Sequence, residues 1–384
     1  MAFVRSLQLH AFRNYRDAVM TELGAGFVVL TGHNGAGKTN VLEAVSLLTP
    51  GRGLRGAKMV DIKNREAPQH VAWSVAAVVE SPVGEVRIGT GMRESTNGTD
   101  RRVVRVNGVD LKAQADVSEY ISCVWLTPQM DGLFGDAASE RRRFFDRLVY
   151  AFDPAHAGRV TRYESVLSQR ARLLREQYQD KKMAADPMWL TSLEATMAET
   201  GVAIAAARLQ TLDSLAAHVG GILEGTGFPV AQMALTGGIE ESLLSAPALD
   251  VEDRMRERLA ASRAFDGENG SACVGPHRTD LQVKYADKGM PAAQCSTGEQ
   301  KALLTGLVLA HAVRTRDVRD AAPVLLLDEI AAHFDARRRA ALFDILGALK
   351  AQVFITGTDA HVFADVMGHA RHMHVGADTL REAA

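Results

Sequence analysis

The amino-acid sequence predicts an α/β fold in which both ends of the chain build one sheet-containing lobe and the middle forms an inserted, mostly helical lobe. Short apolar runs typical of buried strands lie near both ends, at residues 27–30 and 323–327. The stretch from Glu140 to about Gly220 is instead rich in Ala, Leu, Arg, Glu and Gln and poor in Gly, which favours helices. Because the strands after this stretch need partners from the segment before it, the two ends are expected to share a sheet.

The change in composition also sets the expected boundaries of the lobes. Residues 1–125 and 270–384 are predicted to form the sheet-containing lobe, and residues 126–269 the inserted helical lobe. A chain of 384 residues is long for one ordinary hydrophobic core and suits a division into two lobes.

The N-terminal segment is predicted to be rich in strands. Residues 1–10 alternate between polar and apolar, and residues 71–110 contain several further strand patterns. Within them, Asn107-Gly108 lies between Val106 and Val109, a strong signal for a two-residue hairpin. An antiparallel sheet is therefore expected after the first helix.

Further elements are expected along the rest of the chain. The helical lobe should be interrupted at Asp186-Pro187, and the last residues, 378–384, should form a frayed tail. The other expected helices cover residues 250–264, 298–316 and 336–349, and the other expected strands residues 281–285 and 353–355.

Composition and charge exclude several classes of protein. The formal net charge is −2, so any contact with DNA must use local basic patches. Cys123, Cys273 and Cys295 are far apart and form no Cys-x-x-Cys pair, which argues against a disulfide framework or a zinc site and fits a reducing cytosol. The N-terminus shows no apolar signal-peptide segment, and the longest apolar runs are far too short to span a bilayer.

A glycine-rich segment between the strand at 27–30 and a helical pattern matches the phosphate-binding motif G-x-x-x-x-G-K-[ST] in full. Its glycines permit a tight backbone path with N–H groups directed at phosphate oxygens, and the helix that follows points its positive end at the same anion. Lys38 is expected to reach the β- and γ-phosphates of ATP, and the Thr39 hydroxyl to bind Mg²⁺. The motif comprises Gly32, His33, Asn34, Gly35, Ala36, Gly37, Lys38 and Thr39.

An acidic pair, Asp328-Glu329, ends the apolar strand at 323–327. A carboxylate at the end of a buried strand can hold the water shell of Mg²⁺, which is the role expected of Asp328. Glu329 can polarise an attacking water as a general base, so the pair favours hydrolysis over simple switching. Asp335 follows shortly after.

A third segment, Cys295-Ser296-Thr297-Gly298-Glu299, precedes a long apolar helix. By itself it fits an ordinary capping box, because Ser296 and Glu299 are three residues apart. Its position between the phosphate loop and the acidic strand makes it resemble the signature of ABC-type ATPases, Ser-x-Gly-(Gln/Glu). The resemblance implies that Ser296 and Gly298 cap the γ-phosphate bound to another subunit, and that Asp335 lies in the short loop between the two nucleotide sites.

Two sites that are each completed by a partner imply a dimer held together by ATP. Lys38 and Asp328 are 290 positions apart, more than in a transporter ATPase subunit. The helical insertion therefore favours the chromosome-maintenance and recombination branch of the ABC proteins.

Within that branch the chain resembles the RecF family over nearly its whole length. The matching blocks are LQLHAFRNYRD at the start, GHNGAGKTNVLEAVSLLTPGRGLR, TPQMDGLFGDAASERRRFFDRLV, GPHRTDL and CSTGEQKALLTGLVLAHA. Arg13 lies in the Phe-Arg-Asn-Tyr element of the first block, and Asn40 follows the phosphate loop in the second. The resemblance implies that both residues contribute to nucleotide binding.

Two positions differ from the usual patterns. Gln129 stands where many members of the family have an acidic residue, but Gln is the usual ABC residue that touches Mg²⁺ and the attacking water, and we expect that role here. The switch histidine of transporters is missing after residues 353–355. Thr358 or Thr356 is expected to sense the γ-phosphate instead, and His361 is expected to be an ordinary surface residue.

The resemblance implies a cytoplasmic protein of DNA replication and recombinational repair. It implies ATP and Mg²⁺ as cofactors, an ATP-dependent homodimer, weak DNA-dependent ATP hydrolysis and no membrane partner. It further implies binding to duplex DNA at gaps or at junctions of single and double strands, and cooperation with RecR and RecO in loading a recombinase at single-strand gaps.

Several arginine clusters are candidates for phosphate contacts without base readout. For each cluster alone a solvated helix face is the more common arrangement, but we expect at least one of the clusters to bind DNA. The aromatic content of 6% indicates no stacking platform for single strands. The clusters are Arg52 and Arg55; Arg101, Arg102 and Arg105; Arg141, Arg142, Arg143 and Arg147; and Arg159, Arg162, Arg170, Arg172, Arg175, Lys181 and Lys182.

Three other functions are weighed against this one. A transporter ATPase subunit would need a membrane partner and a switch histidine, and would not need the basic helical lobe. A small-molecule P-loop kinase would lack Ser296 and Gly298 in their signature arrangement. The head fragment of a coiled-coil chromosome protein would need long heptad repeats, which the sequence does not contain.

Overall fold

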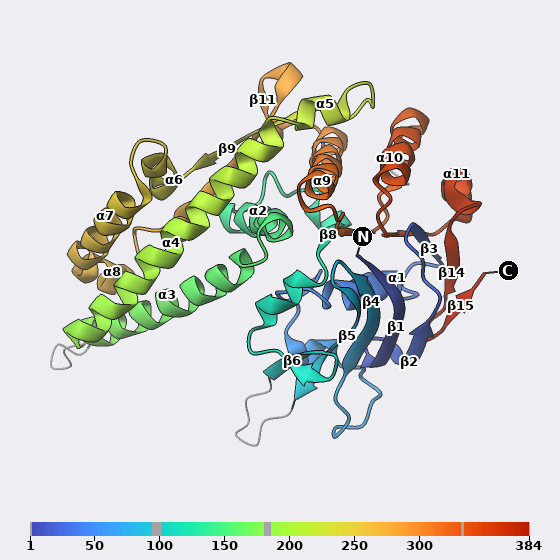
Figure 1. The fold of residues 1–384 in the computed structure, drawn as a ribbon, viewed down its shortest axis with the longest axis horizontal. Coiled ribbons are helices and arrows are strands. Elements are labelled where there is room, and N and C mark those ends of the chain that lie inside the picture. Colours follow the sequence, from blue (N-terminus) through green and yellow to red (C-terminus); the bar gives the residue numbers. More distant parts are fainter. Residues whose placement is uncertain (1, 94–100, 180–185, 332–333, 384) are drawn as a thin grey trace.

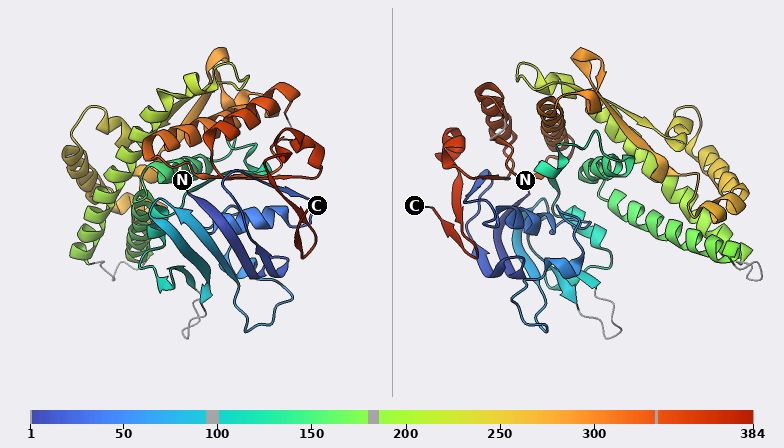
Figure 2. Two further views of the ribbon diagram at one scale, coloured as in Figure 1. Left: turned by 45° about the vertical axis from the view of Figure 1, so that its right-hand side comes forward. Right: turned by 180° about the vertical axis from the view of Figure 1, so that it is seen from behind.

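The computed structural model describes residues 2–93, 101–179, 186–331 and 334–383. A helical arm projects from a lobe that contains two sheets, and both chain termini lie at the sheet-containing lobe (Figure 1). Seen from behind, the same arm extends to the opposite side, with the C-terminal strands at the far edge of the sheets (Figure 2). Within the described ranges, no helix combines the length and the apolar character needed to cross a bilayer.

The first sheet is antiparallel and is built from the N-terminal segment, as expected. Val106 pairs with Val109 across the turn, and both Asn107 (φ 50°) and Gly108 (φ 83°) have positive φ. These are the dihedrals of the two-residue hairpin, which is confirmed. The strand order is β2-β1-β4-β5-β6-β7, with bounds β1 (Phe3–Phe12), β2 (Tyr15–Met20), β4 (Ser74–Ser81), β5 (Gly84–Arg93), β6 (Arg101–Val106) and β7 (Val109–Asp110).

The second sheet joins the two ends of the chain. Its order is β15-β14-β3-β13-β12-β8, and all of its pairings are parallel except that of β15 with β14. The expected frayed tail is wrong for residues 380–382, because these residues pair with β14 at the sheet edge. The strands are β3 (Phe27–Thr31), β8 (Cys123–Leu126), β12 (Val324–Leu327), β13 (Val353–Gly357), β14 (Arg371–Val375) and β15 (Leu380–Glu382).

This parallel sheet is covered on both faces because alternate residues of each strand point to opposite sides. Val28 and Leu30 belong to the apolar core shared with α1 (Lys38–Ser46) and the first sheet. Val29 belongs to the core shared with α9 (Thr297–Arg319) and α10 (Ala336–Leu349). Burial on both faces explains why these strands are continuous apolar runs in the sequence. The short helix α11 (Ala364–Met367) follows β13.

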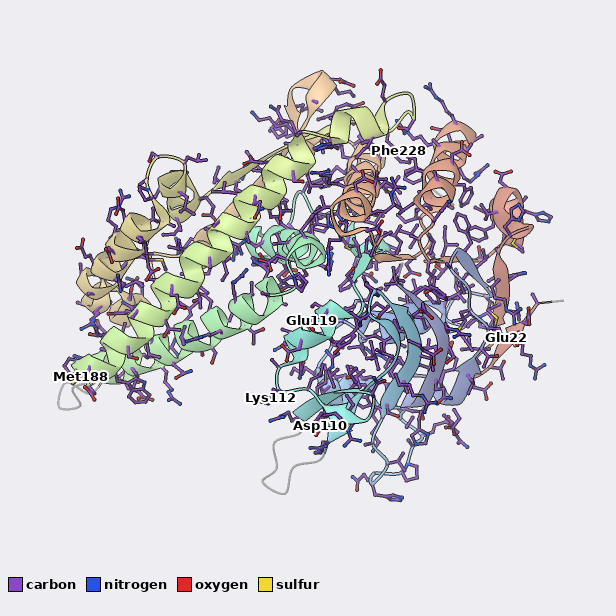
Figure 3. All side chains as sticks on the ribbon, in the orientation of Figure 1. Glu22, Asp110, Lys112, Glu119, Met188 and Phe228 are labelled. Carbon is purple, nitrogen blue, oxygen red and sulfur yellow. The ribbon has the colours of Figure 1, made fainter. Side chains whose placement is uncertain are left out.

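The inserted segment forms the helical arm and a small third sheet. Pro187 begins α4, and the Asp186 side chain caps it by accepting from the Met188 amide, so the expected break is confirmed. Met188 lies at the far end of the arm (Figure 3). The helices are α2 (Ala138–Phe152), α3 (His156–Gln179), α4 (Pro187–Ala216), α5 (Val219–Leu223), α6 (Gly238–Leu243), α7 (Ala248–Ala261) and α8 (Arg263–Asn269).

The third sheet has the order β11-β10-β9, with β9 (Ala231–Thr236), β10 (Asp280–Tyr285) and β11 (Met290–Pro291). Strand β10 lies beyond position 270 but pairs along its whole length with β9. This pairing favours a return to the sheet-containing lobe after residue 291. The division into 1–125 with 270–384 and 126–269 remains a prediction, and the pairing of β10 with β9 favours a later second boundary.

A buried ion-pair network holds the base of the arm together. The Arg208 guanidinium donates two hydrogen bonds of 2.8 Å to the Asp146 carboxylate, and a third to the Pro276 carbonyl. His156 is also 2.8 Å from Asp146, and Glu240 lies 3.5 Å from Arg208. Burial acts to raise the pKa of Asp146, but Arg208 and His156 outweigh it and hold this pKa well below its usual range. The network therefore ties α2, α3, α4 and α6 to one another through charged groups removed from water.

Replacing Arg208 with Met should destabilise the protein by about 3–5 kcal/mol, because Asp146 and Glu240 would stay buried without their cation. Urea unfolding followed by circular dichroism measures this loss. Arg162→Met is the matched control, since Arg162 is exposed on α3, and it should change stability by less than about 0.5 kcal/mol. Equal unfolding midpoints for the two variants would show that the network does not stabilise the arm.

Candidate nucleotide site

Four neighbouring strands of the parallel sheet bring the sequence motifs to one edge. The order β3-β13-β12-β8 places the phosphate loop after β3, the acidic pair after β12 and Gln129 after β8. Since the strands are parallel, their carboxyl ends meet at the same edge of the sheet. Motifs that are up to 290 positions apart in the sequence therefore come together without any long loop.

The phosphate loop has the backbone path that its glycines predict. Gly32, Gly35 and Gly37 have φ values of 155°, 83° and 109°, which residues with a Cβ adopt rarely. Helix α1 begins immediately afterwards at Lys38. The Lys38 ammonium donates to the carbonyls of Gly32 (2.7 Å) and His33 (3.1 Å), so its side chain folds back over the loop. Burial lowers the pKa of Lys38, while the Glu329 and Asp328 carboxylates oppose that shift.

Asn14 and Tyr15, at the turn between β1 and β2, bind the backbone of the phosphate loop. The Asn14 side chain donates to the Ala36 carbonyl at 3.2 Å, and the Tyr15 hydroxyl donates to the Gly37 carbonyl at 3.2 Å. A Cβ on Gly37 would lie 2.6 Å from the Asn14 amide and 2.8 Å from the Tyr15 hydroxyl. Glycine is therefore required there for close approach as well as for its φ angle.

The acidic pair is joined to the phosphate loop by hydroxyl groups. The Thr39 hydroxyl donates to Asp328 Oδ2 at 2.8 Å. The Thr356 hydroxyl donates to Asp328 Oδ1 at 2.7 Å and accepts from the Glu329 backbone N–H at 2.9 Å. Glu329 itself has φ 53°, in the left-handed region that favours glycine. The end of β12 is thus held in an unusual conformation by its neighbour β13.

The donor set fits Mg²⁺ together with a nucleotide phosphate. Thr39 and Asp328 present a hydroxyl and a carboxylate oxygen to the same point, and Mg²⁺ prefers oxygen ligands. Magnesium at phosphate sites is usually held by one or two such protein ligands plus phosphate oxygens. The described residues contain no group of three or more His, Cys, Asp or Glu side chains placed to hold a metal ion.

Arg13 lies beside this region but is engaged in another contact. Its guanidinium donates to both carboxylate oxygens of Glu43 on α1, at 2.8 and 2.6 Å, and to the Asp61 carbonyl. Arg55 donates to the same Glu43 carboxylate at 2.9 Å and to the Asn40 side chain at 2.5 Å. Glu43 is fully buried, so the two arginines neutralise it. Arg13 therefore pairs with the middle of α1 at Glu43, and Asn40 is joined to the same carboxylate through Arg55.

The signature residues begin α9 and face solvent. Ser296 caps the helix, and the Glu299 side chain accepts from the Ser296 amide and hydroxyl, both at 2.9 Å. The capping box is therefore present. Hydrogen bonds to Lys288 and Ser296 lower the pKa of Glu299 to about 2. Ser296, Thr297 and Gly298 are all exposed, and a Cβ on Gly298 would meet no atom within 4 Å. This helix end is open to a partner.

The remaining predicted site residues are distributed around the sheet edge. Gln129 is exposed within the 3-10 turn Pro128–Met130, directly after β8. Asp131, two residues after Gln129, forms an ion pair of 3.2 Å with Lys301 of helix α9. Thr358 is exposed one residue beyond β13, and Asp335 caps α10.

Sequence reasoning did not assign Asn14 and Tyr15 to the phosphate loop. Their contacts join residues that lie more than 20 positions apart, and the only signal for them was their place in the Phe-Arg-Asn-Tyr element. It also named Thr358 ahead of Thr356 for sensing the γ-phosphate. Of the two, the structure brings Thr356 into contact with the acidic pair.

Comparison with known sequences agrees with this architecture. The family model described as "RecF/RecN/SMC N terminal domain" matches residues 3–378. A protein of Mesorhizobium japonicum described as "DNA replication and repair protein RecF" is 48% identical, with 98% of this chain and 97% of that protein covered. A protein of Caulobacter vibrioides with the same description is 47% identical, again with 98% and 97% covered.

Solved structures show the same fold. The recombination mediator protein RecF in a form described as RecF-ATPrS superposes with a TM-score of 0.82 at 25% identity, covering 100% of this chain and 98% of that one. A form described as RecF-ATP gives 0.84 at 24% identity with the same coverage. The Smc head domain of Pyrococcus furiosus gives 0.55 at 17% identity, covering 100% and 97%.

The shared core with an Smc head indicates an ABC-type ATPase fold, and the full-length matches at nearly half identity are more specific. Together with the joined phosphate loop and acidic pair, they show that the chain belongs to the RecF family of DNA replication and repair proteins.

Proposed function

We propose that this chain is an ATP-dependent DNA-binding protein of recombinational repair and replication, and a weak DNA-dependent ATPase. The observation that carries the proposal is the hydrogen bond between Thr39 and Asp328, which joins the two halves of a nucleotide site across 289 positions. Family membership and the ATP-named forms of related structures support it.

In this proposal ATP lies along the phosphate loop with its β- and γ-phosphates at Lys38. The backbone N–H groups of Gly32 to Thr39 and the start of α1 supply partial positive charge there. Lys38, which now donates to two loop carbonyls, turns to the phosphates. Thr39, Asp328 and Gln129 would hold Mg²⁺, which neutralises charge on the phosphate oxygens when bound.

Hydrolysis is assigned to Glu329 as general base. Glu329 comes directly after Asp328, which accepts a hydrogen bond from Thr39. We therefore expect Glu329 to lie beside the γ-phosphate. The attacking water would be oriented by Glu329 and Gln129. Thr358, exposed at the end of β13, remains a candidate for sensing the γ-phosphate, as does Thr356.

A second copy of the chain completes the site. Ser296 and Gly298 are exposed at the N-terminal end of α9, where unpaired N–H groups favour an anion. In the dimer they would contact the γ-phosphate bound by the partner copy. ATP then acts as the link between two copies, and its hydrolysis separates them.

For DNA contact, several arginines are weaker candidates because they have structural roles. Arg170 is buried between Glu194 and Asp266, and Arg102 is buried and donates to backbone carbonyls after α1. Arg141 forms two hydrogen bonds of 2.7 Å to one aspartate. Such groups have no free charge to offer a phosphate. Arg55, Arg105, Arg143, Arg147 and Arg159 also contact other side chains. Of these, Arg105 and Arg143 remain exposed, as does Arg172 beside Glu176.

The exposed members of the clusters are the better candidates. Arg52 and Arg101 belong to the sheet-containing lobe, and Arg162, Arg172 and Arg175 belong to α3 of the arm. In Figure 3, Lys112 lies on the edge of the sheet-containing lobe that faces the arm. Lys181 and Lys182 lie outside the described residues. We propose duplex DNA as the ligand, with phosphate contacts from exposed cations on both lobes.

The finer biology follows from the family. The proposal includes a preference for gapped or junction DNA, cooperation with RecR and RecO, and help in loading a recombinase on single-strand gaps in the cytoplasm. A solved relative is described as part of a RecFOR pathway, which supports this part. Slow hydrolysis would make ATP a timer for the time spent on DNA.

The timer can be tested with two variants at the nucleotide site. Lys38→Arg should abolish hydrolysis, because the longer planar group cannot fit the phosphate contact of an ammonium. Glu329→Gln should bind ATP normally, hydrolyse it at least about 100-fold more slowly and stay longer on gapped duplex DNA. Fluorescence anisotropy after a competitor chase measures the dwell time. Release of DNA by Glu329→Gln as fast as by wild type would contradict the timer.

The dimer can be tested at the signature helix. Gly298→Glu should leave the monomer folded, since its Cβ meets no atom within 4 Å, but should place a negative charge against the partner's γ-phosphate. The ATP-dependent dimer should weaken at least about tenfold, with ATP binding to the monomer unchanged. Sedimentation velocity in a Glu329→Gln background measures this equilibrium. Gly347→Glu on α10 is the matched control, and it should dimerise normally; equal dimerisation of both variants would exclude the signature contact.

A further inference from the structure

The strand order of the parallel sheet raises a question about the nucleotide site. The phosphate loop follows β3 and the acidic pair follows β12, but these strands are not neighbours, because β13 lies between them. The last residues of β13 therefore lie between the phosphate loop and the acidic pair at the sheet edge. Thr356 is the residue at this level, since Ile355 pairs with Leu327 and Thr356 with Leu30.

Both hydrogen bonds of the Thr356 hydroxyl are made with the acidic pair. A hydroxyl has one hydrogen to donate and can accept in return. Thr356 donates to Asp328 Oδ1 at 2.7 Å and accepts from the Glu329 N–H at 2.9 Å. The residue is 1% exposed, so water does not compete for these bonds. The two bonds hold adjacent residues that have different expected roles.

The bond to Asp328 determines how its carboxylate is oriented. With Oδ1 held by Thr356, the other oxygen, Oδ2, is directed at the Thr39 hydroxyl. Rotation of the carboxylate would break at least one of the two bonds. Asp328 therefore presents one defined oxygen at the point where Thr39 also presents its own.

The bond to the Glu329 amide supports an unusual backbone. Glu329 has φ 53°, a conformation that residues with a Cβ adopt only when their surroundings hold them there. The Thr356 oxygen accepts the N–H of this residue and so stabilises the turn that follows β12. The direction of the Glu329 side chain depends on that turn.

We propose that Thr356 is a positioning residue that aligns both carboxylates of the site, Asp328 for Mg²⁺ and Glu329 for water. It acts through these two residues and does not itself touch nucleotide. The inference rests on the proposed function, and it gives Thr356 a role different from the sensing of the γ-phosphate. Thr358, two residues further on and exposed, has no part in this alignment.

The test compares Thr356→Val with Thr356→Ser. Valine keeps the shape and removes the hydroxyl, whereas serine keeps the hydroxyl. The affinity for ATP is measured by titration calorimetry in excess EDTA and again over a range of Mg²⁺ concentrations. For Thr356→Val we expect an unchanged affinity without Mg²⁺, and a loss of about 10- to 100-fold in the gain that Mg²⁺ provides. The kcat for ATP should fall at least as far, because Glu329 is misaligned as well.

Thr356→Ser should restore both quantities to within about threefold of wild type, as expected for a role that depends on the hydroxyl. Thr200→Val on α4 is the matched control and should leave both unchanged, because this buried hydroxyl donates to the Thr196 carbonyl within the arm. Thr356→Ala also lacks the hydroxyl and is smaller, so it should show the same loss even if valine does not fit the site. Circular dichroism and the thermal midpoint report whether each variant is folded. A purely structural role would lower stability and affinity with and without Mg²⁺ alike.

The inference is overturned if either hydroxyl-free variant folds and keeps the wild-type response to Mg²⁺ and the wild-type kcat. It is overturned equally if serine fails to rescue, or if both hydroxyl-free variants unfold while serine does not, since the hydroxyl would then serve folding alone. Failure of the proposed function gives a different result: the wild-type protein itself would show no Mg²⁺-dependent gain in ATP affinity and no hydrolysis.

Discussion

Parallel pairing of β13 with both β3 and β12 is the constraint on which the nucleotide site depends. Strand β3 comes from the N-terminal end of the chain and β12 and β13 from the C-terminal end, so the site does not exist until both ends share a sheet. Backbone hydrogen bonds and burial on both faces enforce this pairing. The helical arm is accommodated because it leaves from β8 at one edge of the same sheet and disturbs no central strand.

The N-terminal ends of α1 and α9 both expose backbone N–H groups that favour an anion, but they differ in how they are capped. At α1 a glycine with positive φ precedes the helix and no side chain caps it, so its N–H groups are open to an anion. At α9 the Ser296 and Glu299 side chains accept from the Glu299 and Ser296 amides, and the helix end is exposed to solvent. A capping box and a phosphate contact are compatible, because the exposed Gly298 amide lies beside the cap.

The arginines of this chain divide between the interior and the surface. Those at the base and middle of the arm neutralise buried carboxylates, as Arg208 does for Asp146 and Arg170 for Glu194 and Asp266. Removing either partner leaves a charge in a low dielectric, which makes these contacts important for the shape of the arm. A count of basic residues along the sequence therefore overstates the charge that is available to a nucleic acid.

The sequence by itself determined the features whose physics acts within a few residues: the phosphate loop before α1, the Asn107-Gly108 hairpin, the start of α4 at Pro187 and the cap of α9. Together with motif order, these sufficed for the fold class and for the expectation that the phosphate loop and the acidic pair meet, as Thr39 and Asp328 do. Tertiary structure alone decided that Thr356 contacts the acidic pair, that Arg13 pairs with Glu43, that β10 joins β9 and that residues 380–382 form an edge strand. Each of these depends on which distant segments become neighbours, and no local periodicity or propensity carries that information.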